Sequence, residues 1–193
     1  TYSENSSVYE DKNDHEIFST FLIKTELPLK KELENSKNFL KPILQLRISP
    51  TNGKNISSSD TRIEFDNIFS PNRIGRSDMV EKGNSVTFGL EFEKQNFNNE
   101  KVLGLNLGNV LKDKENNNLP SKSKLNQTRS DIVGNLFYKL NNNFELNYNF
   151  SYDRDLEYSN YDSISTTLGL NNFETTFDYI TENHDFGDSE VIK

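Results

Sequence analysis

Apolar and polar residues alternate almost without error in two stretches of this chain, residues 85–92 and 144–153. In the first stretch Val86, Phe88, Leu90 and Phe92 lie opposite Ser85, Thr87, Gly89 and Glu91. In the second, Phe144, Leu146, Tyr148, Phe150 and Tyr152 lie opposite Glu145, Asn147, Asn149, Ser151 and Asp153. A period of two predicts extended strands with one apolar and one polar face. Because the polar faces carry amides and carboxylates where a soluble sheet would pack, the pattern is typical of strands between lipid and water.

The same alternation predicts about eight strands along the chain. They cover residues 16–29, 39–49, 85–94, 101–111, 129–140, 144–153, 159–170 and 173–181. Residues 144–152 make eight steps, which is about 27 Å of strand at about 3.3 Å per residue. A strand tilt of about 40° leaves about 20 Å along the membrane normal, close to the roughly 25 Å apolar band of a membrane barrel. These strands are therefore long enough to cross a bilayer.

The connections between these strands alternate in length. Short connections cover residues 30–38, 95–100, 141–143 and 171–172, whereas residues 51–84, 112–128 and 154–158 form longer ones. In an up-and-down barrel every second connection lies on the same side of the membrane, and bacterial outer-membrane barrels keep one set short and the other long. A soluble β-sandwich or β-solenoid has no reason to sort its loops in this way.

We therefore expect an all-β fold: an antiparallel transmembrane β-barrel segment, with about eight strands of a larger outer-membrane barrel. Residues 1–15 would form a polar flank or a preceding loop, residues 16–181 part of the barrel domain, and residues 182–193 the start of a further loop. The polar start of the chain, without an initiator Met or signal peptide, favours a piece of a longer protein.

Composition is compatible with this interpretation. Only 32% of the 193 residues are hydrophobic, and the mean hydropathy is -0.80. A membrane barrel tolerates such values because only alternate strand residues need to be apolar. No apolar run approaches the roughly 20 residues of a membrane-spanning helix. The net charge of -8, without a basic stripe, argues against nucleic acid as a partner.

Candidate chemistry is sparse. The chain has no Cys and only two histidines, His15 and His184, and nothing marks a nucleophile elbow. The acidic runs at residues 113–118 and 185–190 lack the Gly-containing ligand spacing of a calcium loop and read as solvated loop. We expect no catalytic residues, no cofactor and no metal site.

The longest connection carries a motif. Residues 64–73 read Glu-Phe-Asp-Asn-Ile-Phe-Ser-Pro-Asn-Arg, and Asp78 follows, with Val-Glu-Lys-Gly-Asn at 80–84 leading into Val-Thr-Phe-Gly-Leu at 86–90. Together with Leu-Lys-Pro at 40–42, Leu-Arg-Ile-Ser-Pro at 46–50 and Ser-Asp-Ile-Val-Gly at 130–134, this resembles the barrel domain of the LptD family of lipopolysaccharide-assembly proteins. The resemblance covers residues 27–152. One departure is Gly75, which stands one position earlier than the family's usual glycine.

The resemblance implies transport without catalysis. A protein of this kind would insert lipopolysaccharide into the outer leaflet of the outer membrane of a Gram-negative bacterium. It would have an LptE-like plug lipoprotein in its lumen, and it would receive cargo from a periplasmic Lpt bridge through a domain that this chain lacks. The alternative is a small self-contained outer-membrane barrel that acts as an anchor, adhesin or porin. The non-aromatic end of the chain favours the first interpretation.

Strand parity assigns the two faces. The residues expected to face lipid are Leu44, Leu46, Val86, Phe88, Leu90, Phe92, Leu146, Tyr148 and Phe150. Those expected to face the lumen are Thr87, Gly89, Glu91, Gly104, Gly108, Asn147 and Asn149. Several inward side chains are too small to fill a narrow eight-stranded barrel, which favours a wide lumen; they are Ser85, Thr87, Gly89, Asn147, Asn149 and Ser151. Gly104 and Gly108 either admit close approach by another backbone or mark curvature, and curvature is favoured.

The long connection at residues 51–84 is expected to be ordered and to lie within or over the external mouth of the lumen, because a structureless loop of this length is uncommon. Its candidate structural or partner-contact residues are Phe65, Asp66, Asn67, Phe69, Asn72, Arg73, Asp78, Glu81 and Gly83. Arg73 with Asp66, Asp78 or Glu81 forms either a structural ion-pair set or a contact surface for cargo, and the structural role is favoured. Asp66 and Arg73 are the residues whose loss we expect to impair barrel assembly or partner engagement.

Overall fold

The structure is a computed structural model, and it describes residues 19–50, 54–75, 80–170, 173–183 and the backbone of 189–192. These residues form ten strands and one 3-10 turn, η1 (Lys122–Lys124). The strands are β1 (Phe21–Glu26), β2 (Leu29–Leu33), β3 (Ser36–Ser49), β4 (Gly83–Asn96), β5 (Lys101–Lys112), β6 (Ile132–Asn141), β7 (Phe144–Tyr152), β8 (Ser159–Leu170), β9 (Phe173–Glu182) and β10 (Ser189–Ile192). Within the described part of the chain, no helix has the length and apolar character needed to cross a membrane.

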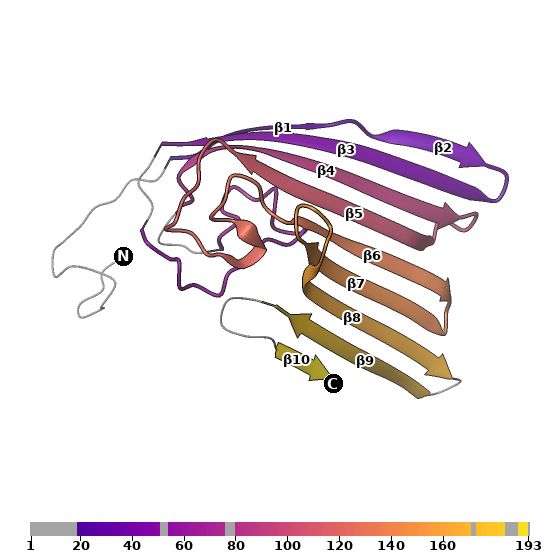
Figure 1. Cartoon of the computed structure of the whole chain (residues 1–193). Coiled ribbons are helices and arrows are strands. Elements are labelled where there is room, and N and C mark those ends of the chain that lie inside the picture. Colours follow the sequence, from indigo (N-terminus) through magenta and orange to yellow (C-terminus); the bar gives the residue numbers. More distant parts are fainter. Residues whose placement is uncertain (1–18, 51–53, 76–79, 171–172, 184–188, 193) are drawn as a thin grey trace, which may run out of the picture.

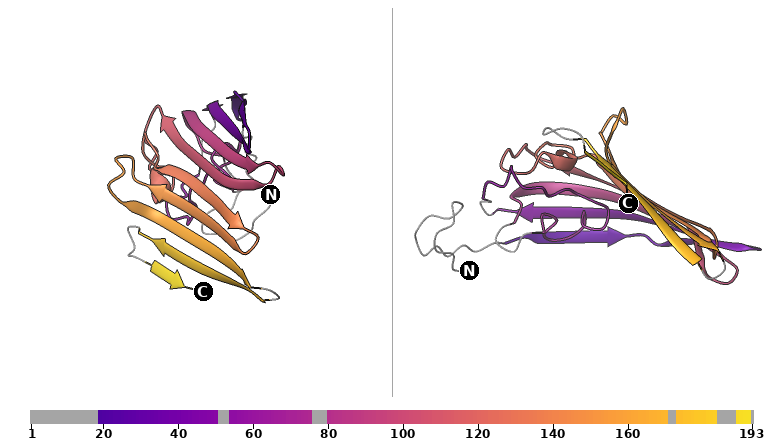
Figure 2. Two further views of the ribbon diagram at one scale, coloured as in Figure 1. Left: turned by 90° about the vertical axis from the view of Figure 1, so that its right-hand side faces the viewer. Right: turned by 90° about the horizontal axis from the view of Figure 1, so that it is seen from below.

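All strands belong to one antiparallel sheet, in which each strand from β2 onward pairs with the next in sequence and β1 pairs with β3 (Figure 1). β1 and β2 lie end to end along the same side of β3. The sheet is curved and open, with β1 and β10 at its edges (Figure 2). The all-β antiparallel fold expected from the sequence is thus confirmed, whereas closure into a barrel stays a proposal.

The lengths of the connections sort by end of the sheet (Figure 1). The long ones gather at one end and comprise a first loop between β3 and β4 (residues 50–82), a second loop between β5 and β6 (residues 113–131) and the connection between β7 and β8 (residues 153–158). The opposite end carries tight turns, such as residues 34–35 between β2 and β3 and residues 142–143 between β6 and β7. We call these the loop end and the turn end.

The first predicted strand is wrong in its bounds. Its residues 16–18 lie outside the described part, and the remainder divides at Leu27 and Pro28 into β1 and β2. β2 takes up residues expected to form a connection, so the turn before β3 is shorter than predicted. Pro42 lies inside β3 opposite this break, where its missing N–H is tolerated. The Pro42 carbonyl still accepts a hydrogen bond from Leu27 N at 3.1 Å.

The prediction of a loop over residues 182–193 is also wrong in part. Glu182 ends β9, and the chain then returns as β10, which pairs antiparallel with β9. The residues of β10 follow no clear alternation in the sequence, so the pattern gave no signal of a strand there. The polar flank at residues 1–15 lies outside the described residues.

The sheet has an apolar face, which we call the outer face, and a polar face, which we call the inner face and onto which the long loops fold. On the outer face Leu44, Leu46 and Phe88 are 41%, 43% and 48% exposed. On the inner face of the same two strands Gln45 and Thr87 are buried, at 1% and 0% exposed. The cross-strand register extends this division, because Gly89 pairs with Gly108 and Asn147 with Phe137. The residues expected to face lipid share the outer face and those expected to face the lumen share the inner one, while contact with lipid and lumen stays a prediction.

The two long loops fold back onto the inner face at the loop end and form a small apolar core there. The core consists of Ile56, Ile63, Ile68 and Ile74 from the first loop, Leu119 and Leu125 from the second, Val110 from β5 and Val133 from β6. Val110 and Val133 look like errors in the polar face when the strands are read alone. Both are fully buried because the loops cover them.

Two glycines of the inner face, Gly89 and Gly108, leave room for side chains of the first loop. A Cβ on Gly89 would overlap the ring of Phe69, and one on Gly108 would lie 3.1 Å from Ile68 Cδ1. Phe69 in turn meets Phe65 edge to face, with ring centroids 5.7 Å apart. The curvature favoured for Gly108 is therefore not its main role, since the glycine admits a close approach. The approaching group is a set of side chains and not a backbone.

We predict that Gly89→Ala destabilises the folded protein by about 1–3 kcal/mol, as overpacking of a well-filled site does. Adding Phe69→Leu removes the ring that the new methyl group meets, so the double variant should recover part of this loss. Denaturant unfolding of the purified protein in detergent measures both effects.

Gly169→Ala is the matched control, because a Cβ at this strand glycine meets only ordinary contacts, the nearest at 3.5 Å. Equal stability of Gly89→Ala and the wild type would contradict the packing of Phe69 on Gly89.

Candidate functional site

A row of inner-face residues crosses three strands at the loop end of the sheet. Arg47 of β3 pairs with Ser85 of β4, and Ser85 pairs with Lys112 of β5. Directly opposite residues on one face of an antiparallel pair lie about 5 Å apart. The register therefore brings two cations to the two sides of Ser85.

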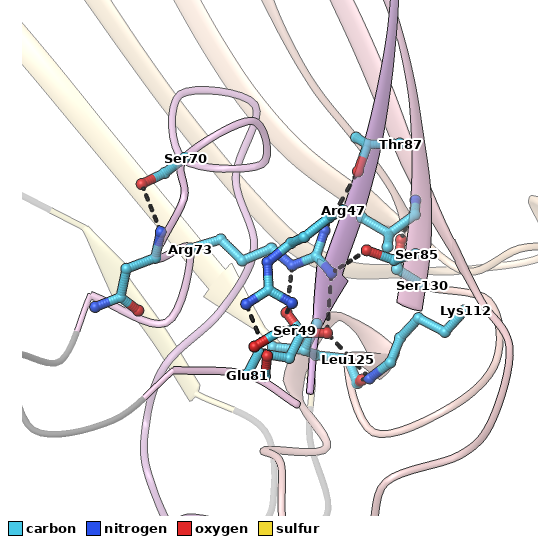
Figure 3. A network of polar contacts seen from close by, with 12 residues as sticks. Arg47, Ser49, Ser70, Arg73, Glu81, Ser85, Thr87, Lys112, Leu125 and Ser130 are labelled. Atoms are coloured by element: carbon cyan, nitrogen blue, oxygen red, sulfur yellow. Dashed lines mark hydrogen bonds and ion pairs between the residues drawn. The ribbon is translucent and has the colours of Figure 1, made fainter. Parts of the chain in front are cut away.

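The first loop places the guanidinium of Arg73 and the carboxylate of Glu81 against this row (Figure 3). Arg73 holds Glu81 with two parallel bonds, Nε to Oε2 at 2.5 Å and Nη2 to Oε1 at 2.9 Å. The same guanidinium donates to the hydroxyls of Ser85 at 3.0 Å and Thr87 at 3.3 Å. Bidentate pairs of this kind are stronger and more directional than single hydrogen bonds. Arg73 thus fastens the loop to β4.

Arg47 and Lys112 complete the contacts of Glu81. Arg47 Nη2 donates to the backbone carbonyl of Glu81 at 2.7 Å, and its Nη1 lies 4.0 Å from Oε2. Lys112 Nζ lies 3.2 Å from Glu81 Oε1 and donates to the carbonyl of Leu125 in the second loop at 2.7 Å. The cluster therefore joins three strands and both long loops.

This ion cluster, made of Arg47, Arg73, Glu81 and Lys112, is almost completely dry. The four side chains are at most 3% exposed. Burial by itself would raise the pKa of Glu81, but the cations outweigh it and lower the pKa to about 2. Glu81 therefore stays ionised at neutral pH and cannot serve as a proton shuttle. The arrangement is suited to holding the loops in place.

A second buried carboxylate ties the loop ends of β6, β7 and β8 together. Asp131 accepts hydrogen bonds from Ser151 Oγ at 3.1 Å and Asn160 Nδ2 at 2.8 Å. Burial raises the pKa of Asp131, and these two hydrogen bonds oppose that shift. Its polar partners are separated by up to 29 residues in sequence, so strand parity alone gave no reason to connect them.

The structure divides the loop residues expected to be functional. Phe65 is buried, Phe69 packs against the apolar core, and Asn67 donates to the carbonyl of Arg62 at 3.2 Å. Gly83 begins β4 with a φ of 112°, a left-handed conformation that favours glycine. These residues shape the loop.

Arg73 and Glu81 form an ion pair, as expected if the charged residues of the motif have a structural role. Asp66 is exposed and forms no ion pair with another described residue, so it does not belong to the cluster. Asn72 lies in the turn before Arg73, where its carbonyl accepts a hydrogen bond from Gly75 N at 3.1 Å. Asp78 lies outside the described residues.

Sequence reasoning missed Arg47 and Lys112 as partners of Glu81. A cation at an inward position of an otherwise apolar strand was the available signal, since a buried charge demands a counter-charge. Within the described residues no group of three or more His, Cys, Asp or Glu could hold a metal ion. His15 and His184 lie outside the described part.

We predict an unequal response to removal of the charges in the cluster. Glu81→Gln leaves three buried cations without a carboxylate and should cost roughly 3–5 kcal/mol of unfolding free energy. Lys112→Met leaves two cations for Glu81 and removes one charge-assisted hydrogen bond, so roughly 1–2 kcal/mol is expected. Denaturant unfolding in detergent compares the two variants.

The control is Glu91→Gln, because Glu91 pairs with Lys41 at 2.7 Å on the same face but is 34% exposed. Its loss should cost at most about 1 kcal/mol. A greater loss for Lys112→Met than for Glu81→Gln would show that the excess positive charge is balanced by another group.

The contribution of Glu81 should depend on pH. Its pKa is lower in the folded state, at about 2, than its ordinary value of 4.5, so the stabilisation is complete above about pH 4.5 and disappears as the pH falls toward 2. The full contribution is roughly 3 kcal/mol. The difference in unfolding free energy between the wild type and Glu81→Gln should therefore be large at pH 7 and much smaller at pH 3. A difference that is the same at both pH values would contradict the ionised state of Glu81.

Comparison with known proteins agrees with the motif in the first loop. The family model for LptD, LPS transport system D, matches residues 1–188. Comparison with individual curated proteins gives no match. The LptD family acts in lipopolysaccharide transport and assembly in the outer membrane of Gram-negative bacteria and is not known as an enzyme family. Since the match covers nearly all of the sequence, this chain belongs to the LptD family.

Proposed function

We propose that this sheet forms part of the wall of an outer-membrane barrel through which lipopolysaccharide reaches the outer leaflet. The observation that carries the proposal is the inverted burial of the two faces. The apolar Leu46 and Phe88 are 43% and 48% exposed, whereas the polar Arg47 and Thr87 beside them are 1% and 0% exposed. A water-soluble sheet buries its apolar face, and a continuous exposed apolar surface of this kind suits contact with lipid.

Aromatic residues support a membrane boundary near the loop end. Tyr148, Phe150 and Tyr152 follow one another on the outer face of β7, with ring centroids 5.2 and 5.7 Å apart. The hydroxyl of Tyr148 donates to Asp162 of β8 on the same face. Tyrosine prefers the membrane–water interface because its ring is apolar and its hydroxyl group hydrogen-bonds to water. The Tyr148 contact also gives the carboxylate of Asp162 a partner in this region.

The inner face offers a polar path toward the turn end. There the strands present Glu91, Asn106, Asn135, Asn147 and Asn149, and Asn106 donates to Asn135 across β5 and β6 at 2.9 Å. Amides and carboxylates suit a hydrated channel for the sugar part of a lipid. The loop end of the same face is occupied by the apolar core and the ion cluster.

The open sheet supports a wide barrel over the alternative of a small self-contained one. An eight-stranded barrel would close with its eighth strand on the first, but β8 pairs with β7 and β9. We infer that β1 and β10 pair with further strands that complete the wall. In such a barrel a plug lipoprotein resembling LptE would lie against the uncovered part of the inner face, and a periplasmic Lpt bridge would deliver the cargo.

The test is site-specific photocrosslinking in living cells with the full-length protein. A photoreactive amino acid at Asn147, on the inner face near the turn end, should give adducts with lipopolysaccharide. The matched position is Leu146, which lies next to it on the outer face. Being near the turn end, Leu146 would face the inner leaflet and should give phospholipid adducts without lipopolysaccharide.

Both variants should assemble and maintain the permeability barrier, since neither position belongs to the ion cluster or the apolar core. Lipopolysaccharide adducts at Leu146 and none at Asn147 would overturn the proposed path and the assignment of the faces.

A further inference from the structure

A pocket of about 240 Å³ lies between the two long loops and the loop ends of β7, β8 and β9. Its wall combines Arg62 of the first loop, Lys122 and Lys124 of the second, Tyr161 of β8 and Glu182 of β9. These segments meet only because both loops fold back on the sheet. The ion cluster described above does not line this pocket.

Positive charge exceeds negative charge on the wall of the pocket. Glu182 is its single carboxylate, and it is already paired with Arg62 Nη2 at 3.2 Å and Lys122 Nζ at 2.8 Å. Lys122 also pairs with Asp60 outside the wall. Arg62 Nε also lies 3.9 Å from Glu64, outside the wall, and Arg62 Nη1 is buried without a hydrogen-bond partner in the described structure. The Lys124 ammonium forms no ion pair with any described residue, so it is the wall cation that remains for a ligand, and it calls for an anion.

The arginine is held in a fixed orientation. Its guanidinium lies over the ring of Tyr161, 4.0 Å from the ring centroid, while Glu182 binds it from β9. A stacked guanidinium is pre-organised, so little side-chain freedom is lost when it binds an anion. The guanidinium of Arg62 therefore adds a fixed positive charge to this part of the wall.

Uncharged polar groups line the rest of the wall. Ser121 and Tyr158 contribute hydroxyls, and Asn160 and Asn183 contribute amides. Groups of this kind donate to and accept from sugar hydroxyls. The wall is too polar for an acyl chain. The volume is below the roughly 300–1,000 Å³ of pockets for drug-sized ligands, which limits the occupant to one small unit.

We propose that this pocket binds one phosphate-bearing sugar unit of the transported lipid, with Lys124 on the phosphate, the charge of Arg62 beside it, and the hydroxyl and amide groups on the ring. The chemistry of the pocket by itself specifies an anionic saccharide. The assignment of that saccharide to lipopolysaccharide rests on the proposed function. The pocket would hold the sugar part of the lipid as it passes the loops.

Isothermal titration of the purified full-length protein in detergent tests the binding, with glucose 1-phosphate as the probe. Glucose and inorganic phosphate serve as comparison ligands. The sugar phosphate should bind roughly tenfold or more tightly than either, because only it engages both the cations and the polar wall. Equal affinity for inorganic phosphate would overturn the sugar part of the proposal, and equal affinity for glucose would overturn the anionic part.

Lys124→Gln should weaken binding of glucose 1-phosphate roughly tenfold, since it removes a charge-assisted contact. Lys114→Gln is the matched control, because Lys114 lies exposed in the same loop and away from the pocket. Arg62→Lys keeps the charge but loses the stacked guanidinium on Tyr161 that holds it in place, so it should weaken binding without abolishing it. A gel-shift assay of heat-modifiable mobility shows that each variant is folded.

The outcomes separate this inference from the proposed function. No binding to the folded wild type, or equal binding by the wild type and Lys124→Gln, would overturn the pocket even if Asn147 crosslinks to lipopolysaccharide. Binding that depends on Lys124 would support the pocket. If Asn147 then gave no lipopolysaccharide adduct, the proposed function would fail while the saccharide site remained.

Discussion

The carboxylate of Glu81 is the point on which the loop end of this structure depends. Glu81 belongs to the first loop and is buried against the sheet, where Arg73, Arg47 and Lys112 surround its carboxylate and stabilise it. A buried charge without partners is very costly, so these contacts form together or not at all. The loop must fold onto the sheet to bring Glu81 to the row formed by Arg47, Ser85 and Lys112. The apolar core then closes beside the cluster.

The packing of the two loops divides the inner face into a covered half and an uncovered half. At the loop end the face is filled, with Val110 and Val133 under the loop side chains and Phe69 seated on Gly89. Toward the turn end it presents uncovered amides such as Asn147 and Asn149. The outer face shows no such change, since apolar residues continue along it. The sheet therefore has an apolar outer face and an inner face that is polar at the turn end and covered by the loops at the loop end.

The small residues of the inner face allow the first loop to pack against the sheet. Ser85 and Thr87 accept hydrogen bonds from Arg73, and Gly89 leaves room for a phenyl ring. Larger side chains at these positions would keep the first loop away from the sheet. The same packing creates the cationic pocket of Arg62, Lys122 and Lys124 at the edge of the covered region. The loops thus form a pocket as well as a cover for the inner face.

The sequence by itself determined the antiparallel sheet, its two faces and the division between long and short connections. Each depends on local information: a side-chain period of two, and turn residues such as those at 142–143. The sequence also favoured a structural ion-pair set around Arg73, but it left Asp66, Asp78 and Glu81 open as its partners.

Only the tertiary structure decided what the loop packs against. Arg47 and Lys112 come from different strands, and their meeting at Glu81 depends on the register across β3, β4 and β5. Val110 and Val133 violate the polar pattern of their strands, and their burial follows from the two loops that cover them, of which the first lies more than 30 positions away in sequence. Asp66 and Glu81 are both acidic residues of one loop, yet only Glu81 is buried. Alternation is read along a single strand, whereas the contacts of a folded loop depend on the whole sheet beneath it.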